Sequence, residues 1–290
     1  MTESRPAARR WHSGPGANRR RAGRIGTYLV LIAVGLIFIG PFLIMLSSAL
    51  KSAGQQVFSF PPDLVPRPPV LTWFKEAWTS VPYPRYLINS VAYVGIGVPL
   101  YVLVSALTAY PLGVMQFRGR TFFFFMFLST MFLPGELMLV PRFIVVSDLG
   151  MADTYQGVIL PGILSAFGIL LLRQAFAGIP REITEAARID GCRELGIFWH
   201  IMVPGARPTM AVMAIFGFIS TWNSFIWPLV VLKDSGKYPI ALGIAYLAGI
   251  TGTDVRSLAA GTVISLVPVV VFFVVMQRHI LEGMRGAVKG

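Results

Sequence analysis

Long apolar runs separated by short polar segments dominate this chain. Crossing the hydrocarbon core of a bilayer, about 30 Å thick, takes roughly 20 predominantly apolar residues of α-helix. Five runs without Asp, Glu, Lys or Arg are about that length or longer, at residues 27–50, 86–117, 154–172, 208–232 and 257–277. A sixth run, 121–141, contains a single acid, Glu136. Because lipid offers no hydrogen bonds to the backbone, each run is predicted to be a helix.

The predicted fold is an all-α membrane protein with six transmembrane helices. We place the spans at about residues 27–50, 86–113, 121–141, 154–174, 206–232 and 257–277, within a transmembrane domain of residues 27–280. A polar loop at 178–204 interrupts this domain. The basic residues 1–26 are expected to be a disordered tail, and residues 281–290 are expected to be a second, shorter tail.

Composition agrees with a multi-span membrane protein. The 290 residues are 55% hydrophobic and 13% charged, which is more apolar than a soluble core of this size requires. The formal net charge of +12 could indicate a nucleic-acid partner. However, the chain lacks zinc-ligand spacing and a basic recognition helix, so no nucleic acid is expected. The three histidines, His12, His200 and His279, lie too far apart in sequence to suggest a metal site.

The distribution of Lys and Arg predicts the orientation, since basic residues accumulate on the cytoplasmic side. The two termini with loops 114–120 and 173–207 hold 17 of them, and the segments on the opposite side hold 8. Both termini and the polar loop are therefore predicted to be cytoplasmic. Cys192, the only cysteine, lies in this loop and agrees with a reducing compartment.

A basic start followed by an apolar run also fits a secretory signal peptide. The run at 27–50 has 24 residues, which is long for a signal core, and no small-residue cleavage site follows it. An uncleaved first span is therefore favoured. On the outer side, residues 70–78 are predicted to form a short interfacial helix, and residues 238–253 a surface or partly inserted connector.

The polar loop carries helix signals on both sides of a glycine. Pro180 suits a helix first turn, and Glu182 and Glu185 favour the N-terminal dipole. Gly191 can take the left-handed conformation that ends many helices. A second helix is predicted from about Cys192, and Pro204 closes it. A lipid-surface helix is the alternative, but the acidic residues of the loop disfavour that interpretation.

The loop resembles the EAA loop of the permease subunits of ABC importers. The matching residues are Glu185, Ala186, Ala187, Gly191, Ile201, Val203 and Pro204, at the family's spacing. Residues 27–290 more broadly resemble the carbohydrate-uptake branch, which includes the maltose-system permeases. The stretches that carry this wider similarity are Asn89-Ser90, Ala109-Tyr110, Phe117–Arg120, Pro134–Glu136, Pro141, Ile189–Gly191, Trp222-Asn223, Trp227–Leu229 and Gly286–Gly290.

The resemblance implies that the first helix of the loop couples the chain to a separate ATPase. The coupling residues it implies are Glu185, Ala186, Ala187, Arg188, Asp190, Gly191, Ile201, Pro204, Lys289 and Gly290. It also implies the partners: a second homologous permease, two ATPase subunits and an extracytoplasmic solute-binding protein, in a bacterial cell membrane. The chain has no GxxxxGK[ST] loop and no nucleophile–base constellation, so neither enzymatic activity nor a cofactor of its own is expected.

The expected cargo is a sugar or a related polyol or glycerol phosphate, because these substrates share the permease pattern. The candidate substrate-path residues are Asn89, Ser90, Glu136, Trp222, Asn223 and Trp227. Each has a structural alternative, since polar side chains in spans often hydrogen-bond between helices. An ion-coupled secondary transporter that uses Glu136 is the alternative function, because such carriers place ionisable groups inside the membrane.

Overall fold

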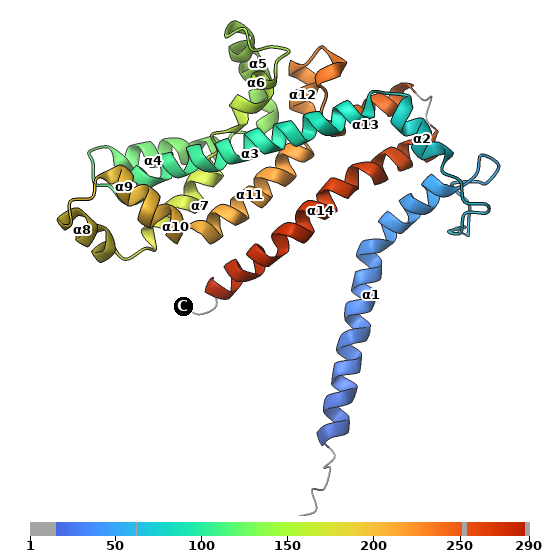
Figure 1. The fold of residues 1–290 in the computed structure, drawn as a ribbon, viewed down its shortest axis with the longest axis horizontal. Helices are drawn as coiled ribbons and strands as arrows, with labels where there is room; N and C mark the ends of the chain where they lie inside the picture. The colour runs from blue at the N-terminus through green and yellow to red at the C-terminus, as the bar shows by residue number, and fades with distance from the viewer. Residues whose placement is uncertain (1–15, 62, 251–253, 288–290) are drawn as a thin grey trace, which may run out of the picture.

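The computed structural model describes residues 16–61, 63–250 and 254–287 (Figure 1). Within these residues the chain forms helices joined by turns and loops, with no strand, so the predicted all-α class is confirmed. Three helices are long: α1 (Gly16–Leu50), α3 (Tyr83–Gly113) and α14 (Val255–Ala287). The shorter α-helices are α2 (Thr72–Thr79), α4 (Arg120–Ser129), α5 (Leu139–Asp148), α6 (Tyr155–Ile159), α7 (Ala166–Ala177), α8 (Arg181–Ile189), α9 (Glu194–Ile197), α10 (Val203–Gly205), α11 (Arg207–Trp222), α12 (Ile226–Val231) and α13 (Ile240–Ile250).

Short 3₁₀ and π segments connect several of these helices. They are η1 (Thr130–Phe132), η2 (Gly135–Met138), η3 (Leu160–Gly162), η5 (Ser235–Lys237) and the π-helical turn η4 (Phe198–Met202). Three continuous segments are long and apolar enough to cross a membrane: Gly26–Leu50, Tyr83–Gly113 and Val255–Gln277. These correspond to the first, second and sixth predicted spans.

The other spans are bent instead of straight. Arg120–Phe132 meets Gly135–Asp148 at 103°, and Tyr155–Gly162 meets Ala166–Ala177 at 47°. Glu194–Gly205 meets Arg207–Trp222 at 76°. Up to six spans therefore result if each bent pair counts as one. Proline and glycine at the first two bends explain them, because proline removes a backbone donor and clashes with the preceding turn.

The fifth span, predicted as one helix at 206–232, is divided. Helix α11 ends at Trp222, and α12 starts only at Ile226. Pro228 has no N–H to donate to residue 224, and its ring would clash with that carbonyl in a continuous helix. Asn223 and Ser224 lie at the break, where their short polar side chains are better tolerated than in a helix interior.

The first and last long helices extend into the segments expected to be tails. Helix α1 begins at Gly16, so residues 16–26 are helical in this structure. Arg and Ala are good helix formers, and extending an existing helix requires no new nucleus. Helix α14 likewise continues to Ala287 through most of the predicted 281–290 tail. Residues 1–15 and the predicted coupling residues Lys289 and Gly290 lie outside the described residues.

Helix α3 is the centre of the bundle, and α7 and α11 pack along it (Figure 1). Helix α14 packs against α1, α2 and α11. Gly168 of α7 makes the close approach to α3 possible, since a Cβ there would lie 2.7 Å from Ser105 Oγ. The main core cluster joins α3 and α7 to the 198–202 turn through Tyr110, Phe176 and Phe198.

On the predicted outer side, α2 (Thr72–Thr79) confirms the short helix expected at 70–78. The connector expected at 238–253 contains helix α13, which packs against α3 and α14. Leu242 and Leu247 are buried in it. Gly243 permits this packing, because a Cβ at that position would lie 2.2 Å from the Tyr86 ring.

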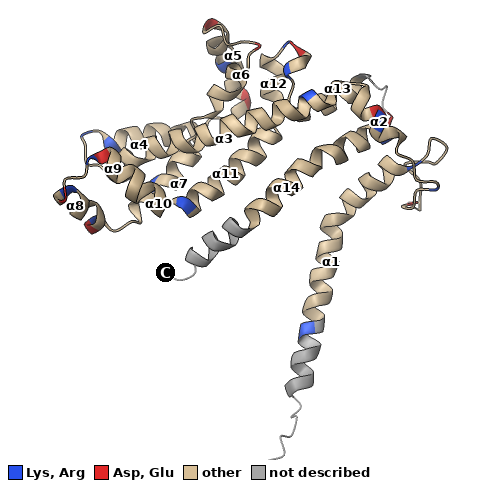
Figure 2. Cartoon of the chain, in the orientation of Figure 1, with Lys and Arg blue, Asp and Glu red and all other residues tan. Residues whose placement is uncertain are grey.

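Charged side chains gather at the two ends of the bundle, as Figure 2 shows. One end contains α8, α9 and the start of α4 and α11. The other contains α2 and the connections after α5 and α12. Between them the middle of α3, of α14 and of α1 carries no charge. This apolar band with charged ends is the distribution that a bilayer requires.

Candidate functional site

The coupling loop (residues 178–204) has the predicted helix–turn–helix form. Gly191 has φ +83°, in the left-handed region. The N–H of Cys192 donates to the Ala187 carbonyl at 2.9 Å, and the N–H of Gly191 donates to the Arg188 carbonyl at 3.0 Å. These two bonds form a Schellman cap, which satisfies the last carbonyls of α8. The second helix begins at Glu194, two residues later than predicted.

The Glu194 carboxylate links the coupling loop to the bundle, in addition to the apolar contacts of the main core cluster. The hydroxyl of Tyr110, in α3, donates to Glu194 Oε2 at 2.5 Å. The Arg188 guanidinium, in α8, donates to Glu194 Oε1 at 2.9 Å across the turn. Tyr110 also packs edge-on against Phe198 at 5.4 Å between ring centroids. Glu194 therefore connects both arms of the loop to the last turn of α3, a role that sequence reasoning did not assign.

Apolar side chains of the loop are exposed alongside its charged residues. Ile189 is 87% exposed and Leu195 68%, and Ile183 and Trp199 are also exposed. Exposed apolar side chains on a polar loop are candidates for contact with another protein or with the membrane. Ile189 and Leu195 were not among the predicted coupling residues. Their apolar type within a polar loop was the sequence signal that could have identified them.

The predicted coupling residues divide into exposed and packed groups. Glu185, Ala186 and Asp190 are exposed on α8 and its cap. Ala187 and Ile201 are partly buried against the main core cluster and so fasten the loop. The partly buried Pro204 lies inside α10, which continues the second helix to Gly205 before the bend into α11. Arg188 pairs within the chain and is not a free contact.

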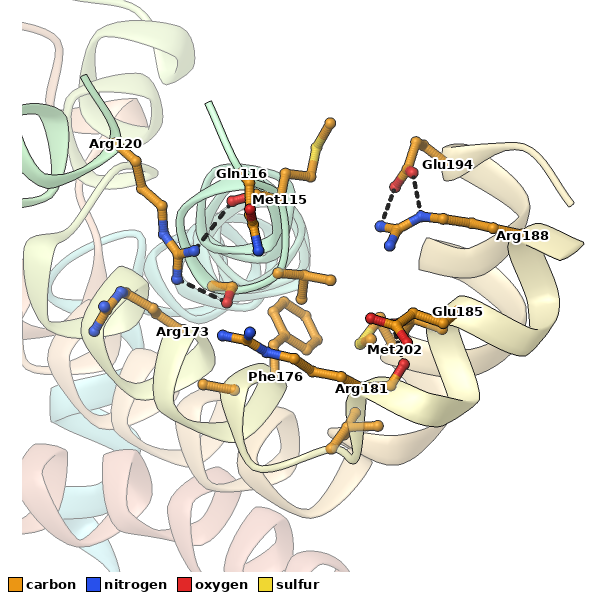
Figure 3. Close-up of a pocket in the computed structure, with 15 residues that line it drawn as sticks. Met115, Gln116, Arg120, Arg173, Phe176, Arg181, Glu185, Arg188, Glu194 and Met202 are labelled. Carbon is orange, nitrogen blue, oxygen red and sulfur yellow. Dashed lines mark hydrogen bonds and ion pairs between the residues drawn. The ribbon is translucent and has the colours of Figure 1, made fainter. Parts of the chain in front are cut away.

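A cavity of about 550 Å³ lies between the coupling loop and the bundle (Figure 3). It is lined by Gly113, Val114, Met115, Gln116, Arg120, Arg173, Phe176, Ala177, Ile179, Arg181, Thr184, Glu185, Arg188, Glu194 and Met202. The residues of α8 that line the cavity are at positions 181, 184, 185 and 188. Their spacing of three or four residues places them on one side of the helix. Glu185 is thus on the cavity side of α8, whereas Glu182 and Ala186 are on other faces.

The predicted path residues Asn89 and Ser90 are buried and hydrogen-bonded within the protein in this structure. Asn89 is 3% exposed and Ser90 2%. The Asn89 amide donates to the carbonyls of Gly236 and Tyr238 at 2.9 and 3.0 Å, and its oxygen accepts from the Tyr155 hydroxyl at 2.7 Å. The backbone N–H of Ile240 donates to Ser90 Oγ at 2.7 Å. Both side chains hold the 236–240 segment against α3.

The two predicted tryptophans are also packed within the protein. Trp227 is buried, its indole N–H donates to the Gly157 carbonyl at 3.1 Å, and Arg142 lies over its ring at 5.0 Å. Trp222 is buried and stacks on Phe218 at 5.5 Å between centroids. Both side chains therefore pack in the core of the protein in this structure.

Asn223 and Glu136 are the two predicted path residues that remain exposed. Each lies at a break in a span: Asn223 caps α11, and Glu136 is in the 3₁₀ turn η2 at the 103° bend. In the described part of the chain no ion pair joins Glu136 to Arg142. Exposed polar groups at interrupted helices are suited to contact a polar solute, since the backbone there is also accessible.

A set of polar contacts to Asp153, here called the clamp, lies at the opposite end of the bundle. It was not predicted. The Lys237 ammonium donates to Asp153 Oδ2 at 3.0 Å. The backbone N–H groups of Lys233 and Asp234 both donate to Asp153 Oδ1 at 3.1 Å. The N–H of Asp234, the Lys237 ammonium and the N–H of Lys233 hold the pKa of Asp153 below its usual value.

The clamp should make stability depend on pH in the acidic range. A carboxyl whose pKa is lower in the folded state stabilises fully above its unfolded pKa, about 3.9, and this contribution is lost as pH falls through the folded value. We expect wild type to be more stable than Asp153→Asn at pH 7, with the difference shrinking below about pH 4. Thermal unfolding of both proteins from pH 7 to pH 3 measures this. Asp148→Asn, at an exposed acid in α5, should follow wild type throughout.

Comparison with known proteins agrees with this architecture. Residues 80–286 match the family described as the inner membrane component of binding-protein-dependent transport systems. The arabinooligosaccharide transport system permease AraQ of Halalkalibacterium halodurans is 38% identical over 76% of this chain and 74% of its own length. The lactose transport system permease LacG of Rhizobium radiobacter is 31% identical over 93% of this chain and 98% of its own.

Among solved structures, a bacterial ABC transporter that imports the acidic polysaccharide alginate contains a chain of the same fold. It superposes with a TM-score of 0.75 at 24% identity, covering 89% of this chain and 96% of that one. This chain therefore shares its overall fold with a chain of that transporter. With more than half its length matched, this chain belongs to the family of binding-protein-dependent transport system inner membrane components.

Proposed function

We propose that this chain is the transmembrane permease subunit of an ATP-driven importer for a sugar or a related polyol or glycerol phosphate. It receives the solute from an extracytoplasmic binding protein and passes it to the cytoplasm by alternating access. The family membership and the arabinooligosaccharide and lactose permeases among the relatives support this proposal. A second, homologous permease and two ATPase subunits complete the transporter. ATP and magnesium bind to the ATPase subunits and not to this chain.

The construction of the coupling loop is the observation that carries the proposal. Its exposed apolar residues offer a surface to a partner, while Glu194 fixes its base to α3. At its other end the loop turns through 76° into α11. A movement imposed on α8 is therefore transmitted to two helices that span the bundle. This is what a chain without its own nucleotide site needs in order to use the ATPase cycle.

Asn223 and Glu136 are the residues we propose for the substrate path. Both are exposed at span breaks, whereas the other candidates are packed in the core. Glu136 forms no ion pair among the described residues. One acid at a bend is weak support for the ion-coupled alternative, because such carriers gather several coordinating groups at mid-membrane. Uptake that needs ATP and withstands an uncoupler separates the two mechanisms.

Charge reversal on α8 tests the proposed ATPase contact. Glu185→Lys should strongly reduce the amount of ATPase that co-purifies with the tagged chain, and ATP-driven uptake should fall with it. Glu182→Lys is the control, since Glu182 is exposed on another face of the same helix. That control disturbs the helix dipole at least as much, because it lies in the first turn. Equal ATPase recovery with Glu185→Lys and wild type would refute the contact.

Thiol labelling tests the proposed cytoplasmic position of the loop. Cys192 is a free, exposed thiol beside the Gly191 turn. A membrane-impermeant maleimide should label it in inverted membrane vesicles and not in intact cells. The Cys192→Ser variant is the blank, since the chain has no other cysteine. Labelling in intact cells would place the loop outside and overturn the proposed orientation.

A further inference from the structure

The cavity behind the coupling loop brings together three arginines from three elements. Arg120 starts α4, Arg173 belongs to α7 and Arg181 starts α8. All three line the same cavity of about 550 Å³. Figure 3 shows the Arg181 guanidinium extending from α8 toward the side where Arg120 and Arg173 lie. This concentration of positive charge at the root of the loop is not used by the coupling mechanism above.

The backbone carbonyls at the C-terminal end of α3 accept hydrogen bonds from two of these arginines. Arg120 donates to the carbonyls of Leu112, Gly113 and Met115 at 2.9–3.1 Å. The Arg173 Nε also donates to the Leu112 carbonyl, at 3.0 Å, and its guanidinium lies over the Phe124 ring at 4.1 Å. A helix C-terminus carries only about half a negative charge. It therefore balances at most part of these two cations.

The acidic residues that line the cavity do not neutralise the positive charge that remains. Glu194 already pairs with the fourth lining arginine, Arg188. This leaves Glu185 as the one other lining carboxylate, and in the described residues it forms no ion pair with Arg181 within 4 Å. The Arg181 guanidinium donates no hydrogen bond within the described residues, nor do the two terminal nitrogens of Arg173. Guanidinium donors without a partner in the described residues thus line a cavity that has excess positive charge.

We propose that this cavity binds a phosphate group. Guanidinium donors match phosphate oxygens in geometry and charge, and several arginines converging on one space are the usual protein solution for holding that group. The cavity is larger than a phosphate ion alone, so it also accommodates the rest of a phosphate ester. A free cytosolic phosphate compound and the headgroup of an anionic phospholipid share this chemistry.

A bound phosphate would connect the loop to the bundle. Arg181 moves with α8, whereas Arg120 and Arg173 are fixed to the end of α3. An anion held by all three stabilises one position of α8 relative to α3 and α7. Binding itself does not depend on the proposed transport function, but an effect on coupling would rest on it.

Phosphate titration of the purified transporter tests the site. The full-length chain, with its co-purifying subunits, is placed in nanodiscs of pure phosphatidylcholine and its thermal unfolding is followed against inorganic phosphate at constant ionic strength. We expect saturable stabilisation, and Arg181→Gln should weaken the apparent affinity at least about tenfold, as expected for losing a charged hydrogen bond. Arg193→Gln removes the same charge from an exposed position of the loop outside the cavity and should leave the affinity unchanged.

A second arm identifies the source of the phosphate. Nanodiscs that contain phosphatidylglycerol replace the free ion. Stabilisation by this lipid that Arg181→Gln abolishes, without a response to free phosphate, assigns the site to a headgroup, and the reverse assigns it to a soluble compound. The proposal is overturned if neither source stabilises wild type, or if Arg181→Gln and Arg193→Gln lower the response equally. A linear effect of phosphate in all variants would be general salting-out and would also overturn it.

Discussion

Gly191→Ala should uncouple the ATPase from transport while leaving the spans inserted. Gly191 has φ +83°, and a residue with a Cβ pays about 1–2 kcal/mol in this left-handed region. A Cβ there would contact nothing within 4 Å, so the backbone conformation alone causes the cost. That energy shifts the balance between the turned and straightened loop by a factor of roughly 5–30. We expect ATP-driven uptake to fall by a similar factor.

A second glycine in the same loop provides the control. Gly196 lies in the helix that starts at Glu194, has no positive φ, and a Cβ there also meets nothing within 4 Å. Gly196→Ala should therefore leave uptake near wild type, because alanine is the better helix former by about 1 kcal/mol. Measuring uptake and the amount of co-purifying ATPase for both variants separates the turn from general packing. Equal losses in the two variants would contradict the role of the Schellman cap.

The coupling loop shows what local sequence can and cannot predict. Pro180 and Gly191 predicted the start of α8 and its left-handed cap, because both signals depend on the backbone of neighbouring residues. The contact between Tyr110 and Glu194 was not predictable in this way. These residues are 84 positions apart, and only the packing of α3 against the loop brings them together.

Several predicted spans are interrupted at proline and glycine, which hydropathy alone does not register. The span predicted at 121–141 bends by 103° at the Pro134-Gly135 pair. The break after Trp222 was missed because the run 208–232 is apolar throughout and hydropathy does not register backbone donors. Pro228 was the available signal, since its effect reaches four residues back.

Four of the six predicted substrate-path residues are buried in this structure, and the sequence does not reveal this in advance. Amides and hydroxyls inside a membrane span can bind a polar solute, but they can equally satisfy protein backbone that is not helical. The segment around Gly236 and Pro239 leaves backbone groups unpaired, and Asn89 and Ser90 meet them. The residue types are the same in both roles, so the sequence of α3 alone does not distinguish them.

Asn89→Ala should lower the stability of the protein in the absence of any substrate. The substitution leaves the carbonyls of Gly236 and Tyr238 and the hydroxyl of Tyr155 without their partner. Each buried polar group left unpaired costs about 1–3 kcal/mol, and some of these groups will recover a partner, so we expect a total loss of about 2–5 kcal/mol. Thermal unfolding of the purified chain, without solute, measures it.

Asn223→Ala is the matched change at an exposed asparagine. It removes no recorded side-chain hydrogen bond in the described residues, so the unfolding curve should stay at the wild-type position, while uptake should fall because Asn223 lies on the proposed path. We therefore expect Asn89→Ala to lose stability and Asn223→Ala to lose transport at wild-type stability. If Asn89→Ala unfolds like wild type and reduces only uptake, then Asn89 contacts the solute after all, and the 236–240 segment must be held by other contacts.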